Sequence, residues 1–184
     1  MRRLVYSVAT SLDGFIAGPK GEYDWILPDS GIDFRAMHGR FDTMLMGRRS
    51  YEVASSRGDF LKETGMRVVV VSTTLGSASS REIVVIDRDV AEAVRALKTE
   101  AGKDIWLSGG SVLFRSLLDM GLVDAIDVSV FPVLLGSGTP LFREGHRAAL
   151  KLDACNALSS GVLMLSYTVS MPPLTTRPEG EPST

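Results

Sequence analysis

Cysteine, histidine and long apolar runs are all scarce in this sequence. Its 184 residues include one cysteine, Cys155, and two histidines, His38 and His146. One cysteine excludes an intramolecular disulfide, and the two histidines have no metal-ligand spacing, so we expect no metal site. No apolar run is long enough to span a bilayer, and the first residues lack the apolar core of a secretion signal. These absences predict a cytoplasmic protein with no membrane partner.

An excess of charge of one sign is also missing. Twenty Lys and Arg residues stand against 22 Asp and Glu residues, for a formal net charge of -2. Nucleic acids are bound through broad basic surfaces, so we expect no nucleic-acid partner. Any anion that the chain binds, such as a small-molecule substrate or cofactor, must meet a local cluster of basic groups.

Short apolar runs alternate with helical patterns, which favours a single α/β domain with a mixed, mostly parallel sheet. The predicted strands are 3–9, 43–46, 67–71, 83–86, 105–107, 125–131, 150–158 and 162–171. Helices are predicted over 30–39, after a cap at Asp87 or Asp89, and from 111 with Leu113, Leu117 and Met120 inward and a stop at Gly121. A turn at 159–161 makes the last two strands an antiparallel hairpin. Residues 1–171 form the predicted domain, and the proline-rich residues 172–184 form a predicted disordered tail.

Residues suited to binding phosphate follow three of the predicted strands. The turn 108–111 reads Ser-Gly-Gly-Ser and opens a helix, whose N–H groups attract anions. The turn 47–50 reads Gly-Arg-Arg-Ser and adds two guanidinium groups, while Ser72 and Thr73 offer hydroxyl donors. Each turn taken alone also fits a tight connection or a solvated helix start. Together they fit the rule that open α/β sheets bind ligands at the carboxyl ends of their strands.

Several side chains are candidates for the substrate side of such a site. Asp13 lies in a loop after the first strand, and it either contacts substrate or braces the turn. Trp25 is placed to cover a nicotinamide or a substrate ring. Asp29 and Asp33 lie where a helix begins, so each is either a catalytic carboxylate or a helix cap.

Taken together, the motifs resemble the dihydrofolate reductase-like family. The resemblance covers residues 3–171 and is nearest to the branch that contains the reductase domain of riboflavin biosynthesis. The motifs that carry it are SLDGFIA, DWILP, LMGRRSYE, VVVVSTTL, WLSGGSVLFRSLL and GLVDAIDVSVFPVLLGSGTPLF. It implies a three-layer α/β/α sandwich, NADPH as cofactor and a homodimer. The implied reaction is hydride transfer to a pteridine, a ribosylaminopyrimidine or another small imine or carbonyl compound.

The resemblance also assigns roles to individual residues. It implies that the cofactor is bound by Ala9, Ile16, Gly47, Arg48, Arg49, Ser50, Ser72, Thr73, Gly109, Gly110, Ser111, Val112 and Leu113. The catalytic candidates are Asp13, Asp29 and Asp33, and the substrate-side candidates are Asp13 and Trp25. The carboxylate of true dihydrofolate reductases corresponds to a place near Ser30. The competing hypothesis is a nucleotide-binding sensor or scaffold without turnover. A Rossmann-type protein is disfavoured because no Gly-x-Gly-x-x-Gly follows the first strand.

Overall fold

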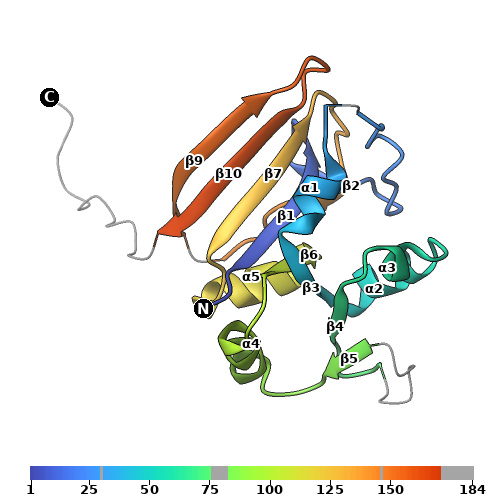
Figure 1. The fold of residues 1–184 in the computed structure, drawn as a ribbon. Coiled ribbons are helices and arrows are strands. Elements are labelled where there is room, and N and C mark those ends of the chain that lie inside the picture. The colour runs from blue at the N-terminus through green and yellow to red at the C-terminus, as the bar shows by residue number, and fades with distance from the viewer. Residues whose placement is uncertain (30, 76–82, 146, 171–184) are drawn as a thin grey trace, which may run out of the picture.

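The chain folds around an eight-stranded sheet (Figure 1). The computed structural model describes residues 1–29, 31–75, 83–145 and 147–170. Six strands of the sheet run parallel: β1 (Leu4–Ser11), β3 (Phe41–Gly47), β4 (Arg67–Val71), β5 (Ile83–Ile86), β6 (Asp104–Gly109) and β7 (Ala125–Phe131). The hairpin of β9 (Ala149–Ala157) and β10 (Leu163–Ser170) completes it, with β10 antiparallel to both β7 and β9. The strand order is β5-β4-β3-β6-β1-β7-β10-β9, which confirms the predicted mixed sheet.

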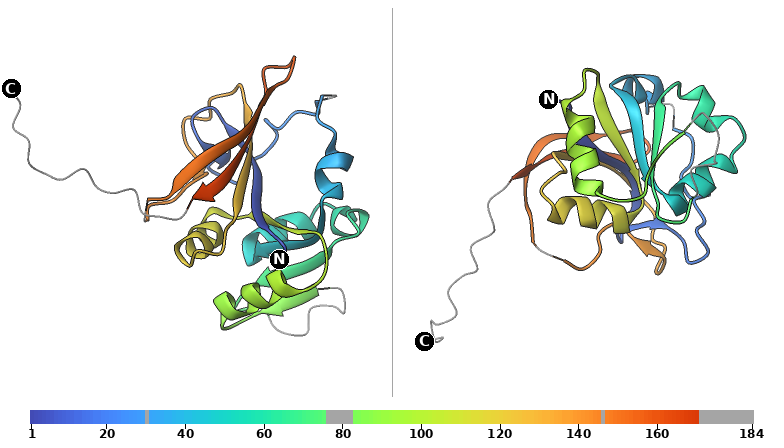
Figure 2. Two further views of the ribbon diagram at one scale, coloured as in Figure 1. Left: turned by 60° about the vertical axis from the view of Figure 1, so that its left-hand side comes forward. Right: turned by 90° about the horizontal axis from the view of Figure 1, so that it is seen from below.

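Helices cover both faces of the central strands (Figure 2). On one face α4 (Val90–Thr99) and α5 (Ser111–Asp119) pack on the largest apolar cluster of the core. On the other face lie α1 (Phe34–Gly39), α2 (Arg48–Ser55) and α3 (Phe60–Glu63). Helices on both sides explain why β4 consists of four consecutive valines after Arg67, since a strand buried on both faces has no polar side.

Local departures from the predictions have local causes. The helix expected over 30–39 begins only at Phe34, because the Asp33 side chain caps it by accepting from the Ala36 N–H. Asp89 occupies the N-cap position of α4, but it has left-handed backbone angles and its side chain makes no capping hydrogen bond. Met120, expected to point inward, is 44% exposed because α5 ends at Asp119.

A small two-stranded ribbon was not predicted. In it, β2 (Phe15–Ala17) pairs with β8 (Thr139–Pro140), two segments more than 120 residues apart in the chain. The ribbon forms beyond the end of β1, where Leu141 N–H donates to Gly14 O at 2.8 Å. Gly138 has a φ of +147°, and a Cβ there would collide with the backbone oxygen of Ala17, so only glycine permits this approach.

Some sequence predictions concern residues that the structure does not describe. The predicted tail 172–184 and His146 lie outside the described residues. No helix within the described ranges is long and apolar enough to cross a membrane.

Tyr6 is the one buried side chain of the described residues whose polar atom has no hydrogen-bond partner. Its ring stacks on Phe114 with centroids 4.0 Å apart, and burial raises the pKa of its hydroxyl. An unpaired buried hydroxyl costs about 1–3 kcal/mol. We therefore expect Tyr6→Phe to raise the free energy of unfolding by about 1 kcal/mol in urea titrations.

The exposed Tyr23→Phe serves as the matched control and should leave the unfolding free energy unchanged. A loss of stability in Tyr6→Phe would mean that the hydroxyl has a favourable partner in solution.

Candidate functional site

The chain changes direction between the neighbouring strands β3 and β6. From β3 it continues through α2 and α3 to β4 on one side, whereas from β6 it continues through α5 to β7 on the other. In open α/β sheets such a switch point leaves a crevice at the carboxyl ends of the two strands. Gly47 and Gly109 are the last residues of these strands, so both predicted phosphate turns lie where this rule places the crevice.

The two helices that start at the crevice lack ordinary N-terminal caps. The N-cap residues of α2 and α5 are Gly47 and Gly110, neither helix has a capping side-chain bond, and neither has an acidic residue in its first turn. In contrast, α1 is capped by Asp33, and α3 and α4 carry Glu63 and Glu92 in their first turns. The first N–H groups of α2 and α5 are thus left with partial positive charge and no anion from their own helix.

Ser50 brings the two turns into contact. A Cβ on Gly109 would lie 3.3 Å from Ser50 Oγ, and one on Gly110 would lie 3.5 Å from it. Gly109 also has a φ of +132°, which L side chains rarely adopt, and a cis peptide bond joins it to Gly110. The glycines therefore keep open a cradle that side chains would fill. Its N–H groups and hydroxyl are the donors that a diphosphate requires.

The two arginines of the 47–50 turn have different surroundings. Arg48 forms an ion pair with Glu52, one helical turn away, at 2.8 Å, and both side chains are about half exposed. Arg49 is exposed and forms no ion pair or hydrogen bond with the described residues. An exposed pair such as Arg48–Glu52 contributes little to stability, so both guanidinium groups remain accessible to a phosphate.

The third predicted strand end, that of β4, lies beside the end of β3. β4 neighbours β3, so Ser72 and Thr73 follow the strand beside Gly47. Ser72 is buried, and its Oγ accepts from the N–H groups of Thr74 and Leu75 at 3.2 and 2.9 Å. Ser72 thus shapes the turn after β4, while the side chain of Thr73 is exposed.

Asp13 braces two loops at the same edge of the sheet. Its carboxylate accepts from Ser11 Oγ at 2.6 Å and from the N–H groups of Leu135 and Gly136 at 3.1 and 2.7 Å. The hydrogen bond from Ser11, followed by those from the backbone of Gly136 and Leu135, lowers the pKa of this exposed carboxyl. These hydrogen bonds hold the turn after β1 against the loop after β7, and a substrate contact of Asp13 stays a prediction.

Asp29 and Asp33 also have structural partners. Asp29 accepts from Ser160 Oγ in the β9–β10 turn and from the Gly31 N–H at 2.7 Å, and the Ser160 hydrogen bond lowers its pKa. Asp33 caps α1, with Ala36 N donating to its Oδ1 at 2.8 Å. A catalytic role for either carboxylate stays a prediction.

Ala9 and Trp25 belong to one apolar cluster at the ends of β1 and β7, where Trp25 meets Phe131 edge to face with centroids 5.7 Å apart. Ile16, in contrast, packs on the cluster beneath α5, together with Leu113. Ser111 is buried at the start of α5, and Val112 is exposed beside it.

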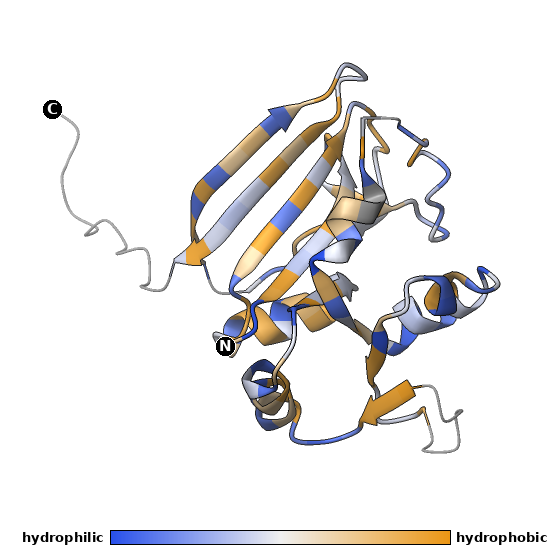
Figure 3. Ribbon diagram, in the orientation of Figure 1, coloured by the Kyte–Doolittle hydropathy of each residue, from blue (hydrophilic) through white to orange (hydrophobic). Residues whose placement is uncertain are grey.

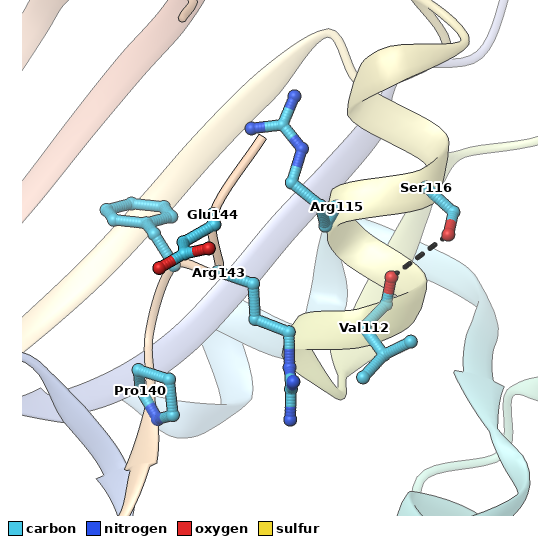
Figure 4. Close-up of a pocket in the computed structure, with 7 residues that line it drawn as sticks. Val112, Arg115, Ser116, Pro140, Arg143 and Glu144 are labelled. Atoms are coloured by element: carbon cyan, nitrogen blue, oxygen red, sulfur yellow. Dashed lines mark hydrogen bonds between the residues drawn. The ribbon is translucent and has the colours of Figure 1, made fainter. Parts of the chain in front are cut away.

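A cleft of about 460 Å³ lies between α5 and the segment after β8 (Figure 4). It is lined by Val112, Arg115, Ser116, Pro140, Phe142, Arg143 and Glu144. Arg143 was not among the predicted site residues, because a single arginine in a loop has no pattern that marks it. Within the described part of the chain, no three His, Cys, Asp or Glu side chains gather as a metal site would require.

Comparison with known families now adds to this geometry. Residues 2–164 match the family model described as the RibD C-terminal domain. The chain belongs to the RibD C-terminal domain family. The uncharacterized protein YyaP of Bacillus subtilis is 36% identical over 177 residues, which cover 90% of this chain and 94% of YyaP.

Solved structures place the family member among dihydrofolate reductase-like folds. A Shewanella sp. PV-4 protein named for riboflavin biosynthesis matches with a TM-score of 0.81 and 25% identity, over 93% of this chain and all of that one. Dihydrofolate reductase from Enterococcus faecalis, solved with NADP(H), matches with a TM-score of 0.69 and 18% identity, over 92% of this chain and 97% of the reductase. The predicted family and fold are confirmed.

The Asp13 brace makes a prediction about pH. Because the folded pKa of Asp13 is depressed, its charge stabilises the fold above the unfolded pKa, about 3.9, and this contribution is lost as the pH falls through the folded pKa. We expect Asp13→Asn to be less stable than the wild type at pH 7, with the difference shrinking as the pH falls below about 4. Urea unfolding at a series of pH values measures this.

The exposed Asp24→Asn is the matched control and should be as stable as the wild type at pH 7. A deficit of Asp13→Asn that stays constant down to pH 2 would show that the carboxylate charge is not what braces the loops.

Proposed function

We propose that this RibD C-terminal domain protein is an NADPH-dependent reductase that transfers hydride to a small heterocyclic, imine or carbonyl substrate. The observation that carries the proposal is the meeting of two uncapped helix N-termini at one switch point, with Ser50 Oγ beside Gly109 and Gly110. The Enterococcus faecalis neighbour, with the same fold, was solved with NADP(H).

In this proposal the diphosphate lies in the cradle between α2 and α5. It accepts from the N–H groups at Gly110, Ser111 and Val112 and from the 47–50 turn, while Arg48, Arg49 and Thr73 face the 2′-phosphate. The nicotinamide extends toward Ala9 and Ile16, and when bound it supplies the hydride. The substrate ring lies on the side of Trp25. Asp13 then serves the reaction by holding the loops around the ring in place.

Arg48 and Arg49 provide the test of the phosphate assignment. Replacing both with alanine removes two guanidinium groups from the proposed 2′-phosphate site, which NADPH fills and NADH does not. We expect the double variant to lose at least about tenfold more affinity for NADPH than for NADH, measured by calorimetry. Equal losses for the two nucleotides would refute the 2′-phosphate assignment.

A second measurement separates a reductase from a nucleotide-binding sensor. NADPH oxidation is followed at 340 nm with pteridine and aminopyrimidine substrates, after wild-type binding of NADPH has been established by a rise in melting temperature. We expect turnover with at least one of these ring compounds. Tight NADPH binding without oxidation by any of them would favour the sensor.

We also propose that the chain forms a homodimer through β9 and β10. β9 is exposed along most of its length and no described helix covers it (Figure 1), and apolar residues stand among polar ones along it (Figure 3). Leu150, Leu152 and Leu163 are 37–51% exposed, and β9 is the edge of the sheet. An unpaired edge strand pairs readily with its own copy about a two-fold axis.

Leu152→Asp places a charge on this surface, and we expect it to convert the dimer to a monomer in light scattering after size exclusion. Leu134→Asp, at another exposed leucine, is the control and should keep the wild-type mass. A monomeric wild type would refute the dimer.

A further inference from the structure

Arg143 reaches from the segment after β8 to the start of α5. Its Nε donates to Ser111 Oγ at 3.3 Å, and Ser111, the first residue of α5, is 2% exposed. Figure 4 shows the guanidinium beside Val112 at the beginning of the helix, whereas the side chain of Arg115 points toward the opposite end of the cleft. The head group of Arg143 is therefore directed at the end of α5 that faces the crevice.

A cation is electrostatically disfavoured at this position. The N-terminus of a helix carries partial positive charge, and α5 has no acidic residue in its first turn to offset it. Arg115 has a carboxylate partner one turn along the helix, Asp119. Arg143 forms no ion pair within the described residues, and its contact with the helix is a neutral hydroxyl. The exposed guanidinium of Arg143 therefore adds positive charge beside a helix end that already attracts anions.

We infer that Arg143 is a cofactor-binding residue that contacts the diphosphate from the side opposite α2. The inference rests on the proposed NADPH site and adds to it a binding residue outside the family motifs. With Nε held by Ser111, both terminal amino groups of the guanidinium remain to donate to phosphate oxygens. Arg143 follows the ribbon strand β8, whose partner β2 carries Ile16, so this contact also links the ribbon to the bound nucleotide.

The alternative is that Arg143 only fastens the segment after β8 to α5. The two roles predict different measurements. A residue that binds the diphosphate affects the affinity for NADPH and NADH alike, because both contain this group. A residue that only holds the segment after β8 against α5 affects the stability of the protein without nucleotide. Arg143→Ala is therefore measured for the Kd of both nucleotides by calorimetry and for its melting temperature without them. Arg143→Lys tests the planar guanidinium separately from its charge.

We expect Arg143→Ala to weaken NADPH and NADH by the same factor, about 10- to 100-fold. The melting temperature of the free protein should change little, because water takes the place of the exposed Arg143 side chain at Ser111 Oγ. Arg143→Lys should lie between the alanine variant and the wild type. The control is Arg3→Ala, which removes the same charge from an exposed arginine at the opposite edge of the sheet and should bind as the wild type does.

Unchanged affinity in Arg143→Ala, or weaker binding that accompanies a lowered melting temperature of the free protein, would overturn the inference. These results leave the proposed function intact as long as the wild type binds NADPH. A wild type that binds neither nucleotide refutes the proposed function, and the role of Arg143 with it.

Discussion

The parallel pairing of β3 with β6 is the constraint on which the candidate site depends. These strands are neighbours in the sheet although more than 50 residues separate them in the chain, and the helices that follow them leave on opposite faces. Two helix N-termini are therefore held at the same edge of the sheet without either helix covering the other. Their partial charges add where an anion would lie, and Ser50 Oγ lies close to Gly109 and Gly110 between the two turns.

The three candidate carboxylates accept hydrogen bonds within the protein, whereas the first N–H groups of α2 and α5 have no capping side chain. Asp13, Asp29 and Asp33 each accept hydrogen bonds from the backbone or from a serine, and in each case the contact fixes a loop or a helix start. At the 47–50 and 108–111 turns, in contrast, helix N–H groups and the guanidinium groups of Arg48 and Arg49 are available to an anion, although Glu52 pairs with Arg48. This division suits a site whose chemistry is supplied by a bound nicotinamide and whose protein groups position it.

The β2–β8 ribbon connects the loops held by Asp13 to the start of α5. Asp13 holds the loop after β7, the ribbon extends from that loop, and Arg143 follows the ribbon to α5. One continuous set of contacts thus runs from the end of β1 to the first turn of α5. Gly138 is essential to it, because no larger residue fits against the backbone oxygen of Ala17.

The sequence by itself indicated the eight strands of the main sheet, though not the β2–β8 ribbon, together with the Gly-Gly and Gly-Arg-Arg turns and the family. These depend on local periodicity, on glycine and on motifs that lie in one stretch of chain. It left the roles of Asp33 and Asp13 open, since a short carboxylate fits a cap, a brace or a catalyst equally well. Only the tertiary structure decided which turns meet, that Ser50 lies against Gly109, and that Arg143 reaches Ser111. These contacts join residues 32 to 59 positions apart, and the order of the strands in the sheet, which no local pattern encodes, brings them together.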